Sequence, residues 1–120
     1  MLEIYGIANC DTVKKARVWL TERGIGHQFH DFKKVGVSAD QLQSWAHAVG
    51  WEKLLNRQGT TWRKLQPDQQ QGVVDAGSAL ALMQAQPSLI KRPVVAWPGG
   101  PISVGFKAED WTSRITRENP

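Results

Sequence analysis

The chain has 120 residues, a formal net charge of +4 and a hydrophobic content of 41%, including six tryptophans. This length and composition suit one globular domain with a buried core. A single cysteine excludes a framework of internal disulfides and favours a reducing compartment. No apolar run approaches membrane-spanning length and the first residues lack a secretory pattern, so we expect a cytoplasmic protein with no membrane partner. The fifteen Lys and Arg residues are scattered, so the charge does not call for direct binding to nucleic acid.

Strands and helices alternate at the start of the chain. An apolar run predicts a strand over 2–5, and apolar residues at helical spacing predict a helix over 11–24. Alternating residues over 27–32 predict a second strand. The sequence therefore predicts a β-α-β start with a parallel strand pair and a right-handed crossover.

The middle of the chain has the pattern of a helical block. Ser38, followed by Gln41, has the spacing of a capping box and predicts the start of a helix. Mixed apolar and polar residues over 51–71 indicate short helical turns. Asp75 is a suitable N-cap for a further helix that ends before Pro87.

The last third returns to strands and ends in a helix. Residues 93–97 and 102–104 flank the sequence Pro-Gly-Gly-Pro, which predicts an antiparallel hairpin. Helical spacing of apolar residues follows over 108–115. The order is β-α-β, a helical block and β-β-α, with no repeat or linker that would indicate a second domain.

Cys10 is the residue that most directly indicates chemistry. It lies where the first strand gives way to a helix, and the free N–H groups and positive dipole end of a helix stabilise an anion. A thiol in that position acquires a lowered pKa and becomes a nucleophile at neutral pH, helped by Lys14 one turn further on. The alternative is a small buried hydrophobe, and position alone does not decide between the two. Asn9 is placed either to cap the helix or to orient the thiol.

Histidines and tryptophans have plainer interpretations. His27 and His30 are three residues apart on a predicted strand, so they face opposite sides and form a poor metal pair. We therefore expect no metal site. Trp45, Trp51 and Trp62 alternate with leucines, which favours core packing over stacking on nucleic acid bases.

Four motifs together resemble one known family. They are residues 7–16, 60–65, 89–95 and 104–106. In this order they resemble the arsenate reductase (ArsC)/Spx superfamily, and most closely its YffB branch. The resemblance implies an α/β fold of the thioredoxin-like, or glutaredoxin-like, type with a mixed four-stranded sheet. It further implies that 1–120 form a single domain in which 36–86 are a helical insertion.

The same resemblance assigns roles to individual residues. The family's nucleophile falls on Cys10, and its basic residue before a cis proline falls on Arg92, so Pro93 is the expected cis proline. The implied function is a glutathione-dependent monothiol reductase that acts on disulfides or mixed disulfides, with no bound cofactor and with glutathione as co-substrate. The expected substrate-binding residues are Asn9, Lys14, Arg57, Arg92 and Pro93.

Departures from the better-known branches narrow the expected activity. Arsenate reductases carry a histidine at the position of Gly6 and oxyanion-binding arginines at those of Asn56 and Gly105. Because an arsenate adduct needs convergent cations, we do not expect arsenate reduction. Spx regulators carry a C-x-x-C switch, whose second cysteine is Val13 here. The alternatives are a non-catalytic Spx-like regulator or partner-binding protein, with RNA polymerase as its partner, and a divergent arsenate reductase.

Overall fold

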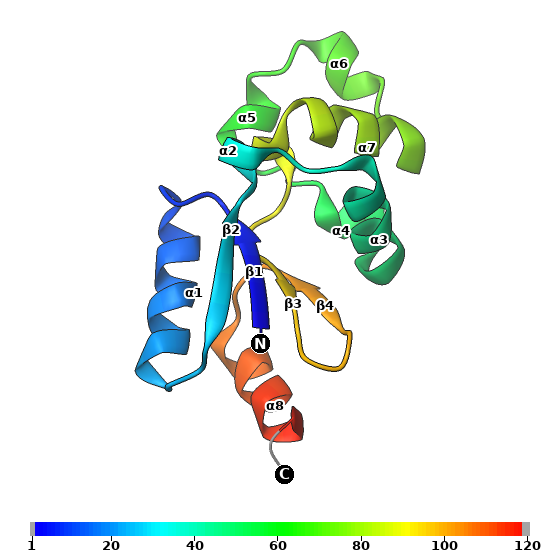
Figure 1. Ribbon diagram of the computed structural model, residues 1–120. Coiled ribbons are helices and arrows are strands. Elements are labelled where there is room, and N and C mark those ends of the chain that lie inside the picture. The colour runs from blue at the N-terminus through cyan, green and yellow to red at the C-terminus, as the bar shows by residue number, and fades with distance from the viewer. Residues whose placement is uncertain (1, 119–120) are drawn as a thin grey trace. The chain divides into compact units, whose positions relative to one another are not determined.

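The chain divides into two units that differ in secondary structure (Figure 1). The computed structural model describes the backbone of residues 2–118 and the side chains of residues 2–115. The sheet unit consists of residues up to Asp31 and from Arg92 onward, and the helical unit is Phe32–Lys91. Among the described residues, no helix is long and apolar enough to cross a membrane.

The sheet unit contains all four named strands and two of the helices. In chain order its elements are β1 (Leu2–Gly6), α1 (Asp11–Glu22), β2 (His27–Asp31), β3 (Val94–Ala96), β4 (Ile102–Val104) and α8 (Ala108–Glu118). The strand order is β2-β1-β3-β4, with β1 parallel to β2 and antiparallel to β3, and β3 antiparallel to β4. The expected mixed four-stranded sheet and the hairpin around the Pro-Gly-Gly-Pro loop are thus confirmed.

The core of the sheet unit lies on one face of the sheet. Leu2 and Ile4, two residues apart on β1, point to that face because side chains alternate along a strand. Trp111 of α8 is fully buried in the same cluster, and its ring centroid lies 5.1 Å from that of Trp97 and 5.7 Å from that of Trp19 on α1. Helices α1 and α8 therefore cover the same face, with a group of edge-to-face indole rings between them.

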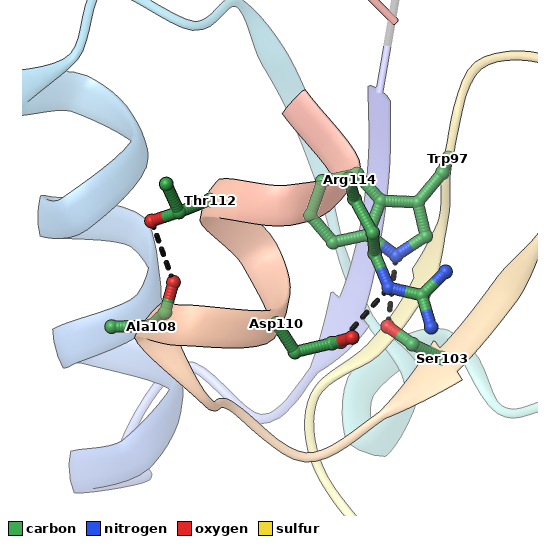
Figure 2. A network of polar contacts seen from close by, with 6 residues as sticks. All are labelled: Trp97, Ser103, Ala108, Asp110, Thr112 and Arg114. Carbon is green, nitrogen blue, oxygen red and sulfur yellow. Dashed lines mark hydrogen bonds and ion pairs between the residues drawn. The ribbon is translucent and has the colours of Figure 1, made fainter. Parts of the chain in front are cut away.

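Polar pairs of the hairpin and of α8 lie next to each other within this unit (Figure 2). Ser103 is buried, and its Oγ accepts a hydrogen bond of 2.8 Å from Nε1 of Trp97. On α8, Arg114 Nε lies 2.9 Å from Asp110 Oδ2, and the guanidinium lies 5.6 Å from the Trp97 ring centroid. The buried indole N–H thus has an acceptor, which avoids the cost of an unpaired donor.

The helical unit is built from short helices. They are α2 (Phe32–Val35), α3 (Ala39–Val49), α4 (Trp51–Leu54), α5 (Thr60–Arg63), α6 (Pro67–Gln71), α7 (Ala76–Ala85) and the 3-10 turn η1 (Pro87–Leu89). Ser38 caps α3 by accepting the backbone N–H of Gln41, and Asp75 caps α7, both as predicted. Leu55 and Ile90 form an isolated antiparallel β-bridge within this unit. The unit encloses residues 36–86, the segment expected as an insertion.

Helix α1 and strand β2 both end earlier than predicted. Helix α1 ends at Glu22, because Arg23 N donates to Leu20 O in a tightened last turn and Gly24 then adopts a φ of +66°. Strand β2 ends at Asp31, because Phe32 instead begins α2. The buried ring of Phe32 has its centroid 6.5 Å from that of Trp45, so Phe32 packs within the helical unit. At the end of β2, tertiary packing thus overrides the local alternating pattern.

Candidate active site

Cys10 occupies the N-cap position of α1. A tight turn leads to it from β1, closed by a 3.1 Å hydrogen bond from Cys10 N to Ile7 O. Its backbone is extended, with φ −105° and ψ 125°, and its carbonyl accepts the first hydrogen bond of the helix from Lys14 N. The side chain is half-exposed. The cysteine is therefore accessible at the positive end of a helix of 12 residues.

Gly6 allows the first turn of α1 to approach the end of β1 closely. A Cβ atom built on Gly6 would lie 2.7 Å from Cγ2 of Val13, a fully buried residue of the first turn. Any larger side chain would have to displace Val13. A histidine at this position, as in the arsenate reductase branch, would therefore clash with the present packing of α1.

Opposing effects set the pKa of the Cys10 thiol. Partial burial raises this pKa, but hydrogen bonds from the backbone N–H of Val13 and from the Arg92 side chain lower it. The positive charge of Arg92 and the backbone N–H of Thr12 lower it further. The balance holds the pKa of Cys10 below its ordinary value, so the thiolate is populated at a lower pH than in a free cysteine.

Arg92 and Pro93 form the other side of the site. The Arg92–Pro93 peptide bond is cis, as the resemblance implied, and it directly precedes β3. Pro93 is buried, and its carbonyl accepts a 2.9 Å hydrogen bond from Gly105 N just after β4. The hairpin therefore fixes the segment that carries the Arg92 guanidinium to the thiol.

Lys14 and Asn9 contact each other. The Lys14 ammonium donates to Oδ1 of Asn9 at 3.5 Å, on the exposed surface. The cation that lowers the pKa of Cys10 is Arg92. The N-cap of α1 is Cys10 itself, which also answers whether Asn9 caps the helix. Asn9 and Lys14 remain beside the site as polar groups that a ligand would meet.

Arg57 belongs to the helical unit, where two indole rings flank it. Its guanidinium lies 5.7 Å from the ring centroid of Trp51 and 5.6 Å from that of Trp62, a geometry that favours cation–π attraction. Both tryptophans are half-buried, whereas Trp45 is buried as expected. Core packing is thus confirmed for Trp45, whereas Trp51 and Trp62 are only partly buried and lie beside the exposed guanidinium of Arg57.

The histidines of β2 have structural partners. His30 Nε2 lies 2.7 Å from Glu3 Oε1, and its ring stacks on Tyr5 with centroids 4.6 Å apart. His27 Nδ1 lies 3.1 Å from Ile25 O. Within the described part of the chain, no three His, Cys, Asp or Glu side chains are grouped to hold a metal ion.

Comparison with known proteins places these features in a family. The family model described as "ArsC family" matches residues 5–113. A Haemophilus influenzae protein without an assigned function is 38% identical over 92% of this chain and 96% of its own length. The transcriptional regulator Spx of Streptococcus pyogenes is 22% identical over 98% of this chain and 87% of its own.

Solved structures agree with the family match. The YffB protein PA3664 is 45% identical, with a TM-score of 0.89 over 96% of this chain and 99% of its own. An arsenate reductase-related protein of Brucella melitensis is 51% identical, with a TM-score of 0.75 over 95% and 93% of the two chains. Their likeness extends through both the sheet unit and the helical unit. This chain therefore belongs to the ArsC family and shares the thioredoxin-like α/β fold of its arsenate reductase-related relatives.

Proposed function

We propose that this chain is a glutathione-dependent monothiol reductase of disulfides and mixed disulfides. The observation that carries the proposal is the position of Cys10, at the start of α1 with Arg92 beside it and a lowered pKa. Because the chain has one cysteine, a second thiol must come from solution to complete the reaction. Glutathione is the external thiol that suits a reducing compartment.

The reaction has two exchange steps. The Cys10 thiolate attacks the glutathione sulfur of a mixed disulfide, a new S–S bond forms between Cys10 and glutathione, and the substrate leaves as a thiolate that takes up a proton. The thiolate of a second glutathione then attacks the sulfur of the bound one. This step releases glutathione disulfide and restores the Cys10 thiolate. The substrate thiol is thereby released from its mixed disulfide, and one glutathione from solution joins the bound one as glutathione disulfide.

The roles of the surrounding residues follow from this scheme. Arg92 stabilises the Cys10 thiolate as attacking and as leaving group and is proposed to contact a glutathione carboxylate. Lys14 and Arg57 are proposed as further carboxylate ligands, and Asn9 as a hydrogen-bonding partner of the peptide part. Pro93 shapes the groove in which the disulfide lies. None of these steps calls for a bound cofactor.

A mass and turnover experiment tests the proposal. The protein is incubated with glutathione disulfide and its mass is measured, and reduction of glutathionyl-hydroxyethyl disulfide is followed with excess glutathione. We expect one glutathione adduct on Cys10 and turnover that rises with glutathione concentration. Cys10→Ser is the matched control and should show neither. A wild-type protein that forms no adduct and turns over no disulfide would rule out the reductase.

The Spx similarity favours a second candidate, a regulator that acts by binding another protein. Under this alternative, RNA polymerase is the partner to test, and binding should persist in Cys10→Ser. Arsenate reduction is the third possibility, suggested by the description of the Brucella melitensis relative. An arsenate reduction assay with glutathione, run beside the disulfide assay, separates it from the proposed activity. We expect the disulfide, and not arsenate, to be reduced.

A further inference from the structure

The exposed face of α1 carries an excess of positive charge around an uncovered apolar residue. We define the α1 basic face as Lys14, Lys15, Arg17 and Val18 of the helix together with Arg23, which directly follows it; all five residues are exposed. Val18 is 54% exposed and is one of the few large hydrophobic residues of the described chain in that state. The helix starts at Cys10, so this surface leads directly away from the thiol.

Two surface depressions meet at Val18. Both are lined by Lys14, Val18 and Glu22. One extends to Arg17, and the other extends over the Trp19 side of the helix. Each depression therefore combines apolar surface at Val18 with two or more basic side chains and the single carboxylate of Glu22, a net positive lining that suits an apolar side chain flanked by carboxylates.

Aromatic rings hold two of the cations in place. The Arg17 guanidinium lies 4.3 Å from the ring centroid of Phe29, and that of Arg23 lies 4.0 Å from the ring of Trp19. Arg23 Nη1 also donates to the carbonyl of Trp19 at 3.2 Å. A guanidinium that is already positioned loses less conformational freedom when a partner binds, so these arginines are suited to recognising an anion.

We propose that the α1 basic face docks the protein half of the disulfide substrate as an acidic, extended segment with an apolar residue against Val18. The inference rests on the proposed function, because it assigns a substrate class to the Cys10 reaction. Charge complementarity selects the partner: Lys14, Lys15, Arg17 and Arg23 face solvent, and the carboxylates on α1 are Asp11 and Glu22.

Helix geometry fixes the spacing that such a substrate must have. Val18 is eight residues after Cys10, which corresponds to about 12 Å along the helix axis. An extended peptide covers this distance in about three to four residues. The preferred substrate therefore has a cysteine, an apolar residue three or four positions away, and acidic residues around both. Attack by Cys10 on the glutathione sulfur then releases this segment as a thiolate, which is protonated.

Matched peptides test the docking. Three synthetic peptides carry one glutathionylated cysteine and a leucine four residues away, with flanking positions that are all Glu, all Gln or all Lys. We expect kcat/KM to fall in the order Glu, Gln, Lys, by about fivefold at each step, and the differences to shrink at high salt. Glutathionyl-hydroxyethyl disulfide, which lacks a peptide, serves as the small substrate and should show little dependence on salt.

Variants on and off the face locate the contact. Arg17→Glu should lower kcat/KM for the Glu peptide about fivefold, and Glu22→Gln should raise it, while both leave the small substrate unchanged. Val18→Ala should also lower kcat/KM for the Glu peptide, although it changes no charge. Lys53→Glu makes the same charge change at an exposed residue of α4 and should have no effect. If the Arg17→Glu variant unfolds because it loses the contact between the Arg17 guanidinium and the Phe29 ring, Val18→Ala and Glu22→Gln still test whether the peptide binds to the α1 basic face.

The outcomes separate the two proposals. Turnover of the small substrate with equal rates for the three peptides would overturn the docking and leave the reductase standing. Failure to turn over even the small substrate would overturn the reductase. Duplex DNA that inhibits the Glu peptide at equal charge concentration would show that the face binds polyanions in general, which also overturns the inference.

Discussion

Helices α7 and α1 differ in the group that lies against the free N–H donors of their first turn. At α7, Asp75 Oδ1 accepts the backbone N–H of Ser78 at 2.9 Å, and the Ser78 hydroxyl contacts Asp75 in return. At α1 the cap is a thiol, and the positive charge of Arg92 comes from a segment more than eighty residues away in sequence. The first arrangement is local and reciprocal, whereas the second depends on the tertiary fold.

The difference indicates what each helix start contributes. Both groups have a lowered pKa: that of Asp75 because Ser78 donates backbone and side-chain hydrogen bonds, and that of Cys10 despite a partial burial that opposes the shift. A carboxylate is already ionised at neutral pH, so its cap contributes to stability. A thiol becomes ionised near neutral pH only through such a shift, so its cap contributes reactivity.

Cys10→Ser should give the largest effect on activity and little effect on stability. Serine is a favoured N-cap residue, so we expect the free energy of unfolding to stay within about 0.5 kcal/mol of the wild type or to rise. Disulfide reduction should fall to the uncatalysed rate. Urea unfolding and the turnover assay measure the two quantities. A large loss of stability would show that the thiol has a structural role at the start of α1.

Arg92→Met should raise the pKa of Cys10, because it removes both a hydrogen bond and a positive charge from the thiolate. Below the pKa, the thiolate fraction falls about tenfold for each unit of the rise, so alkylation by iodoacetamide at pH 6 should slow accordingly. At a pH above both pKa values the two proteins should react at similar rates. Arg92→Lys keeps the charge, so its alkylation rate at pH 6 should lie between those of the wild type and Arg92→Met. Equal pH profiles would assign the low pKa to the helix alone.

Asp75→Ala should lower stability and leave disulfide turnover unchanged. Because the pKa of Asp75 is lower in the folded than in the unfolded chain, its contribution is present above the unfolded pKa and is lost as pH falls through the folded pKa. Thermal unfolding of the wild type and of Asp75→Asn, which keeps a capping side chain, should therefore converge in acid. A difference in melting temperature that does not depend on pH would contradict this assignment.

Ser38→Ala should have the smallest effect of the four. Ser38 caps α3 by accepting a 3.1 Å hydrogen bond from Gln41 N, whereas Asp75 and Ser78 bond each other reciprocally at the start of α7. We expect a loss of about 1 kcal/mol in the free energy of unfolding and no change in turnover. Urea denaturation of Ser38→Ala beside Ser38→Thr, which keeps an oxygen acceptor, measures it. A loss shared by both variants would point to packing instead of capping.

Much of the fold could be predicted because its signals are local. The Ser38 and Asp75 caps, the parallel first pair and the glycine-rich hairpin each depend on residues that are near one another in sequence. The end of β2 could not be predicted, since Phe32 continues the alternating pattern while its ring packs in the helical unit. Element ends depend on such long-range contacts, which periodicity does not contain.

The candidate site was only partly accessible from the sequence. The position of Cys10 at a helix start follows from local pattern, but its contact with Arg92 joins residues on distant segments and came from family resemblance alone. Lys14 was the nearest cation in sequence, and its ammonium instead contacts Asn9. The backbone N–H groups of Thr12 and Val13, by contrast, belong to the free donors of the first helical turn that the strand-to-helix pattern predicts around Cys10.

The tryptophans give each unit its own spectroscopic reporters. Three of the six indoles, including Trp111, lie in the sheet unit and three in the helical unit. Those in the sheet unit are buried edge to face, so they should emit at short wavelength and give near-ultraviolet circular dichroism. Trp51 and Trp62 are half-buried beside the Arg57 guanidinium and should emit at longer wavelength. The wavelength of tryptophan emission therefore reports which unit unfolds first, without an added fluorescent label.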